Sequence, residues 1–126
     1  MSLLNRIFGS NEGQDSEKER GFWKIMTSEQ MLEDAVQKSH EKKVVLFKHS
    51  TRCFISQTVL KNFEREVKAS DKDAEYYFLD LIAFRTVSNR IAELFDIEHQ
   101  SPQLIVLENG KAIKNASHNS ISLDLV

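Results

Sequence analysis

An uninterrupted run of apolar residues, VVLF at positions 44–47, constrains the fold of this chain more than any other feature. A strand with one face in water alternates apolar and polar side chains, whereas a continuous β-branched run suits a strand that is covered on both faces. The run therefore predicts the central strand of a parallel or mixed sheet with helices packed on it.

Amphipathic stretches on both sides of this run supply the helices. Thr27 and Gln30 have the spacing of a capping box, which predicts a helix over residues 28–40. Its apolar stripe consists of Met31, Leu32, Ala35 and Val36. Beyond a polar turn at residues 49–52, a second helix is predicted because apolar residues recur every four positions. They are Ile55, Val59, Phe63 and Val67, with Leu60 beside them.

The remaining elements follow from similar patterns. FWKIM at 22–26 and YYFLDLI at 76–82 predict strands, and residues 103–116 hold two extended runs joined at Asn109-Gly110, a dipeptide typical of tight hairpins. The last six residues, ISLDLV, are consistent with the start of a terminal helix. A third helix is predicted by the apolar residues Val87, Ile91, Ala92, Leu94 and Phe95.

The predicted order, β-α-β-α-β-α-β-β, indicates an α/β fold with a mixed central sheet flanked by helices. Two features narrow it to a thioredoxin-like fold. Cys53 lies at the junction from the second strand into the second helix, and Pro102 stands just before the strand that enters the hairpin. Residues 9–21 are polar and contain Gly and Ser, which predicts a mobile linker. We therefore expect a short N-terminal segment and linker over 1–21 and one domain over 22–126.

Composition excludes several classes of function. The 17 basic and 19 acidic residues are interspersed and give a net charge of −2, which provides no surface for nucleic acid. No apolar run approaches the roughly 18 residues needed to cross a membrane, and the start lacks the features of a signal peptide, so we expect a cytoplasmic protein. One Cys and four scattered His offer no spacing for a protein-only metal site.

Cys53 is the only cysteine, so any disulfide chemistry involves a second molecule. A lone cysteine is often a small buried hydrophobe. The polar neighbours Thr51, Arg52 and Ser56 favour a reactive thiol instead. The free N–H groups in the first turn of a helix also favour the thiolate, which is the attacking species.

Neighbouring residues are candidates for supporting this thiolate. Arg52 and, on the preceding turn, Lys48 and His49 are potential cations. Ser56 stands where a dithiol motif has its second cysteine, and it has two interpretations: an ordinary first-turn helix residue, or a hydroxyl that donates to the Cys53 thiolate. In both cases serine cannot resolve a disulfide, which predicts a monothiol cycle completed by a small thiol from solution.

Pro102, the only proline, also has two interpretations. It either begins a strand, where its missing N–H is harmless, or forms a cis bond with Ser101. The cis bond would turn the Ser101 backbone toward the thiol, where it can pair with an extended peptide or thiol ligand. Its distance along the chain from Cys53, which spans a helix, a strand and a helix, favours the cis form.

Several separated segments resemble one family. KHSTRCFIS at 48–56, HQSPQ at 99–103, ENGK at 108–111 and ASHNSIS at 116–122 are similar to the YtxJ-type monothiol bacilliredoxins, thioredoxin-like redox homeostasis proteins of the bacillithiol system. The resemblance implies an oxidoreductase that removes bacillithiol from S-bacillithiolated client proteins. It implies Cys53 as nucleophile, Ser56 as the occupant of the second-cysteine site, and Ser101 and Pro102 as the wall facing the bound thiol.

The resemblance also implies the partners. Bacillithiol is a co-substrate, no cofactor is bound, and a flavin- and NADPH-dependent reductase recycles bacillithiol disulfide. Phe54 departs from the family, which commonly has Pro after the cysteine; Phe offers clients an apolar surface. Phe47 stands where thioredoxins have a buried Asp, which argues against a general dithiol reductase.

Two other functions stay open. A cluster-binding monothiol glutaredoxin has a C-G-F-S motif only loosely similar to C-F-I-S, and Phe54 would crowd its [2Fe–2S] cluster. A non-catalytic thioredoxin-like binding module would leave Cys53 idle and bind clients near Pro102. His118 either approaches the active surface or caps a strand end in solvent, and the second is favoured.

Overall fold

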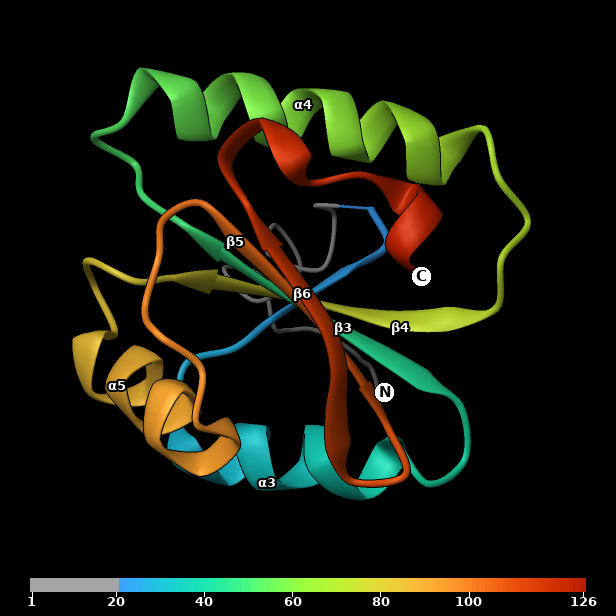
Figure 1. Cartoon of the computed structure of the whole chain (residues 1–126), viewed down its shortest axis with the longest axis vertical. Coiled ribbons are helices and arrows are strands. Elements are labelled where there is room, and N and C mark those ends of the chain that lie inside the picture. Colours follow the sequence, from blue (N-terminus) through green and yellow to red (C-terminus); the bar gives the residue numbers. More distant parts are fainter. Residues whose placement is uncertain (1–20) are drawn as a thin grey trace, which may run out of the picture.

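The computed structural model describes residues 21–126, and a five-stranded mixed sheet forms its centre (Figure 1). The strands lie in the order β2-β4-β3-β5-β6, with β3 in the middle as predicted. β2, β4 and β3 are parallel, and β5 and β6 are antiparallel to their neighbours. Their bounds are β2 Trp23–Ile25, β3 Lys43–His49, β4 Ala74–Asp80, β5 Gln103–Glu108 and β6 Lys111–Ser117. Apart from Gly21, the predicted N-terminal segment and linker lie outside the described residues.

Helices cover both faces of the sheet, as predicted. α3 (Glu29–Lys38) and α5 (Arg85–Phe95) lie on one face (Figure 1). α4 (Phe54–Lys68) lies on the other, together with the 3-10 turns η1 (His118–Ser120) and η2 (Leu123–Leu125). No helix in the described part of the chain combines the length and apolar character needed to cross a membrane.

The central strand separates two apolar cores. Val45 and Phe47 pack in the core under α4, while Val44 and Leu46 pack in the core under α3 and α5. All four side chains are at most 1% exposed. The continuous apolar run therefore reflects a strand covered on both faces, because successive side chains point to opposite sides of the sheet.

Three predicted boundaries are wrong. Ser28, not Thr27, caps α3: its extended backbone lets its Oγ accept a hydrogen bond from the Met31 N–H at 3.2 Å. β3 does not end before Lys48, because Lys48 and His49 still pair with Leu79 and Asp80 of β4. β4 ends at Asp80, whose Oδ1 accepts from the N–H groups of Ile82 and Ala83 and so turns the chain.

The expected terminal helix at ISLDLV is also wrong. Ile121 and Ser122 have extended backbones, and only a single 3-10 turn, Leu123–Leu125, follows. Ser122 caps this turn, with its Oγ accepting from the Asp124 N–H. Leu123 is buried in the core under α4, so the segment closes that core rather than extending as a helix.

The predicted hairpin at Asn109-Gly110 is confirmed. Both residues have left-handed backbones, with φ of 54° and 78°, as a two-residue turn between twisted strands requires. The Asn109 N–H donates to the Ser39 carbonyl and the Gly110 N–H to the Ser39 Oγ, both at 2.8 Å. The hairpin turn is thereby fastened to the end of α3.

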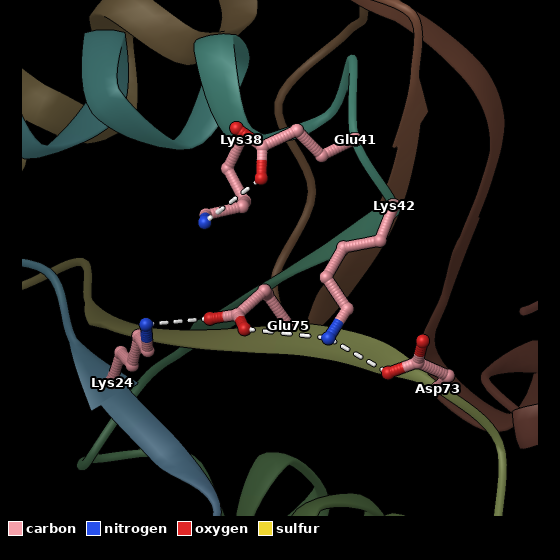
Figure 2. Close-up of polar contacts among 6 residues, drawn as sticks. All are labelled: Lys24, Lys38, Glu41, Lys42, Asp73 and Glu75. Carbon is pink, nitrogen blue, oxygen red and sulfur yellow. Dashed lines mark hydrogen bonds and ion pairs between the residues drawn. The ribbon is translucent and has the colours of Figure 1, made fainter.

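A group of ion pairs joins β2, β4 and the residues before β3 (Figure 2). Glu75 lies between Lys24, at 2.6 Å, and Lys42, at 3.7 Å, and Lys42 also contacts Asp73 at 2.7 Å. The hydrogen bond from Lys24, assisted by the charges of both lysines, holds the pKa of Glu75 below its usual value despite partial burial. The carboxylate is therefore stabilised in the folded chain.

We predict that Glu75→Gln lowers the free energy of unfolding at neutral pH by about 0.5–1 kcal/mol, since the pair is partly solvated. The pKa of Glu75 is lower in the folded than in the unfolded chain. Its stabilising contribution is thus present above the unfolded pKa and is lost as the pH falls through the folded pKa. Urea unfolding measured from pH 7 down to about pH 3 should show the two proteins converging.

Glu41→Gln is the matched control for this experiment. It removes the exposed i,i+3 pair with Lys38, 3.3 Å long, and should change the stability little at any pH. A difference between wild type and Glu75→Gln that stays constant as the pH falls would contradict the assignment.

Candidate active site

Cys53 lies immediately before α4 and is its N-cap residue, with φ −106° and ψ 118°. The predicted start of the helix near Cys53 is thus confirmed. The side chain is partly exposed and makes no capping hydrogen bond. The partly exposed Cys53 therefore lies beside the free N–H groups of the first helical turn, whose partial positive charge favours an anion.

The turn that carries Cys53 is held by its own backbone and by α4. The Cys53 N–H donates to the Ser50 carbonyl at 3.2 Å, and the Cys53 carbonyl accepts from the Gln57 N–H at 3.1 Å. The Gln57 side-chain amide donates to the Thr51 carbonyl at 3.1 Å. These contacts fix the backbone on both sides of the thiol.

Ser56 lies in the first turn of α4 and is fully buried. Its Oγ is 2.8 Å from Nδ1 of His49 and accepts a hydrogen bond from the Ser50 N–H at 3.2 Å. Ser56 does lie in the first helical turn, but its hydroxyl has buried partners that neither interpretation anticipated, and a hydrogen bond to a Cys53 thiolate stays a prediction. In the structure the hydroxyl joins the end of β3 to the start of α4.

His49 is a functional candidate whose position the sequence reasoning missed. It was expected as a cation on a turn, but it is the last residue of β3, 5% exposed, and its ring packs on Phe78 with centroids 5.4 Å apart. The alternation Val45, Phe47, His49 was the available signal. These positions share one face of the strand, so His49 belongs on the α4 side.

Lys48 was also expected on an exposed turn, and that position is wrong. It is a fully buried strand residue, and alternation places it on the face of α3 and α5. Its Nζ donates to the Ser88 carbonyl at 3.1 Å and lies 3.3 Å from His99 Nδ1. Burial lowers the pKa of Lys48 to about 8. Its support of the Cys53 thiolate stays a prediction.

Arg52 and Phe54 flank the cysteine on the surface. Arg52 is exposed, so its predicted support of the thiolate would act through solvent and is weakened by salt. Phe54 is 80% exposed and Ile55 49%, and both are among the large apolar side chains exposed in the described chain. An apolar surface therefore lies directly beside the thiol.

The Ser101–Pro102 peptide bond is cis, as predicted. Gln103 pairs with Lys48, and β3 and β5 are antiparallel. Pro102, one residue before Gln103, therefore lies next to the end of β3, after which the chain turns toward Cys53. The Ser101 Oγ is buried and has no hydrogen-bond partner among residues 21–126. Cys53, Ser101 and Pro102 thus lie at the same edge of the sheet.

The loop before Pro102 is tied to its surroundings on two sides. The buried Gln103 side chain donates to the Glu98 carbonyl at 3.0 Å, and the Pro102 carbonyl accepts from the His118 N–H at 3.1 Å. The His118 side chain is exposed, which agrees with its favoured interpretation. For His99 the pKa lies below the usual value because of burial first and then the charges of Lys48 and Arg85.

Comparison with known proteins identifies relatives of this arrangement. The family model described as "Monothiol bacilliredoxin BrxC" matches residues 24–126. A solved structure described as a candidate oxidoreductase with a thioredoxin fold is 28% identical, with a TM-score of 0.73 over 83% of this chain and 90% of that one.

Two thioredoxins are more distant. Thioredoxin from Fasciola hepatica is 13% identical (TM-score 0.65; 81% of this chain and 91% of that one). Thioredoxin from Malassezia sympodialis is 17% identical (TM-score 0.59; 75% and 76%). These likenesses concern the fold alone, and with the first neighbour they confirm the predicted thioredoxin-like fold.

We predict that Phe54→Pro raises the free energy of unfolding by about 0.4–1 kcal/mol. Position 54 begins α4, where a helical N–H has no partner within the helix, and the backbone of Cys53 already has the conformation that precedes proline. Urea unfolding measures the change. Phe54→Ala, which loses the exposed ring but keeps the N–H, is the control and should not gain stability. A destabilised proline variant would contradict the prediction.

The buried Lys48 predicts a second pH effect. Its pKa of about 8 is depressed from 10.5, so the unfolded chain binds a proton that the folded chain releases above about pH 8. Stability should therefore rise with pH, by at most about 1.4 kcal/mol per unit. Lys48→Met should lose this rise in urea unfolding between about pH 7.5 and 9.5.

The range stops below about pH 10, where tyrosine ionises in the unfolded chain. Burial raises the pKa of Tyr76 and Tyr77 in the folded chain, so above that pH they would add an opposite trend. Lys61→Met, which removes an exposed lysine of α4, is the control and should keep the rise. Equal slopes for wild type and Lys48→Met would show that Lys48 is not the titrating group.

Proposed function

The chain belongs to the monothiol bacilliredoxin family, and from this we propose that it is a thiol-disulfide oxidoreductase that removes bacillithiol from S-bacillithiolated cytoplasmic proteins. The observation that carries the proposal is the position of Cys53. It is the one cysteine of the chain, partly exposed at the start of α4, and lies at the same sheet edge as the cis bond before Pro102.

In the first step, the Cys53 thiolate attacks the bacillithiol sulfur of the mixed disulfide on a client. A disulfide forms between Cys53 and bacillithiol as the bond between bacillithiol and the client breaks. The client leaves as a thiolate and takes a proton from solvent. The N–H groups at the start of α4 favour the attacking thiolate.

In the second step, a free bacillithiol thiolate attacks the bacillithiol sulfur bound to Cys53. This releases bacillithiol disulfide and restores the Cys53 thiolate, so one free bacillithiol is consumed for each client thiol released. Ser56 cannot perform this step because a hydroxyl is no nucleophile in disulfide exchange. Bacillithiol is thus a co-substrate, no resident cofactor is needed, and a flavin- and NADPH-dependent reductase regenerates bacillithiol.

Other site residues bind rather than react. The Ser101 backbone, turned by the cis bond before Pro102, would pair with the extended backbone beside the client's modified cysteine. Phe54, largely exposed next to Cys53, would contact apolar client surface. Arg52 and Lys48 are proposed to favour the thiolate by their charge.

The decisive experiment is intact mass measurement after brief incubation of the protein with a bacillithiolated client. We predict that one bacillithiol appears on the wild-type chain while the client is released as free thiol. Cys53→Ala is the control and should leave the client modified. Adding free bacillithiol should then return the wild-type chain to its unmodified mass.

Other results would favour the cluster-binding function or the non-catalytic binding module. A client that stays modified in the presence of wild-type protein would refute bacillithiol removal from it. A brown purified protein that loses its colour in Cys53→Ala would instead favour the cluster-binding function. An unmodified Cys53 with the client bound but unchanged would favour the binding module.

A further inference from the structure

The buried His49 has no role in the exchange steps described above. It ends β3 beneath the turn that carries Cys53, with its ring against Phe78 and only 5% of its surface exposed. A buried imidazole is costly unless its nitrogen atoms have polar partners. The hydrogen bonds of His49 therefore indicate its role.

A chain of three hydrogen bonds leads from His49 to the backbone of Cys53. His49 Nδ1 lies 2.8 Å from the Ser56 Oγ, which accepts from the Ser50 N–H at 3.2 Å. The Ser50 carbonyl in turn accepts from the Cys53 N–H at 3.2 Å. His49 and Ser56 are both buried, so water does not compete for the hydrogen bond between them.

The Ser56 hydroxyl depends on the histidine. A hydroxyl has one proton and two acceptor sites, and the Ser50 N–H occupies one of the acceptor sites. Without His49, a fully buried hydroxyl would lose its only side-chain partner among the described residues. Such a group regains a partner only by rotating or by admitting water, and both loosen its hold on Ser50.

We propose that His49 is a positioning residue for Cys53, which acts through Ser56 and Ser50 to keep the thiol at the N-terminus of α4. The inference rests on the proposed role of Cys53 as nucleophile and deepens it. In this role His49 does not touch the substrate. By holding the Cys53 backbone, His49 keeps the first-turn N–H groups of α4 directed at the sulfur, and this orientation affects the reactivity of the thiol.

The test compares His49→Asn with His49→Leu. The two replacements have nearly the same shape and lose the same ring packing, but only asparagine keeps a polar atom that can reach Ser56. The readout is the rate at which iodoacetamide alkylates Cys53, followed by intact mass. We expect the leucine variant to react about 10-fold more slowly than wild type and the asparagine variant to stay within about 3-fold.

Ser56→Ala removes the hydroxyl that connects His49 to Ser50 and leaves the histidine unchanged. It should slow alkylation as much as His49→Leu does, and the double variant should be no slower than either single one, because both act along one path. Urea unfolding establishes that each variant is folded. Should His49→Leu not fold, Ser56→Ala decides, and its reaction at the wild-type rate would overturn the proposal.

Three results for folded variants would overturn the inference. If His49→Asn and His49→Leu slow alkylation equally, His49 acts by packing alone. The inference also fails if both variants react at the wild-type rate, or if the effects of His49→Leu and Ser56→Ala add in the double variant. Alkylation needs neither bacillithiol nor a client. Failure of the proposed exchange reaction would therefore leave this test unaffected, and the two failures are distinguishable.

Discussion

β3 is covered on both faces, and the positions of the three helices follow from that coverage. Val45 and Phe47 need α4 above them, and Val44 and Leu46 need α3 and α5 below, so no layer can be removed without exposing the strand. The hydrophobic effect thereby holds the three helices against the sheet. The thiol owes its place to this arrangement, since α4 must start where β3 stops.

The end of β3 carries the polar contacts that refine this placement. His49 and Lys48 are consecutive, so they point to opposite faces. His49 reaches Ser56 at the start of α4, while Lys48 reaches the Ser88 carbonyl of α5 and His99 in the loop before Pro102. Two neighbouring residues of one strand thus contact both segments that border the site, the cysteine turn and the cis-proline loop.

Much of the fold and part of the site could be predicted from the sequence. The central strand, the three helices and the Asn109-Gly110 hairpin follow from local patterns, and the cis Ser101–Pro102 bond follows from its spacing from Cys53 in a thioredoxin-like fold; the structure has each of them. Lys48 and His49 could not be placed so simply, because charged and titratable residues after an apolar run are typical of a turn. Pairing with β4 extended the strand through both and buried them.

Periodicity, turn residues and the composition of the Cys53 segment act over a few positions, so they were enough to predict the strands, the three helices and the thiol at the start of α4. The contacts of the polar residues around Cys53 depend instead on how distant segments pack. Ser56 was expected at the thiolate or in an ordinary helical turn, and it lies against His49. Such choices depend on which buried donors and acceptors meet when the sheet and helices pack, and every buried polar group must find its partner there.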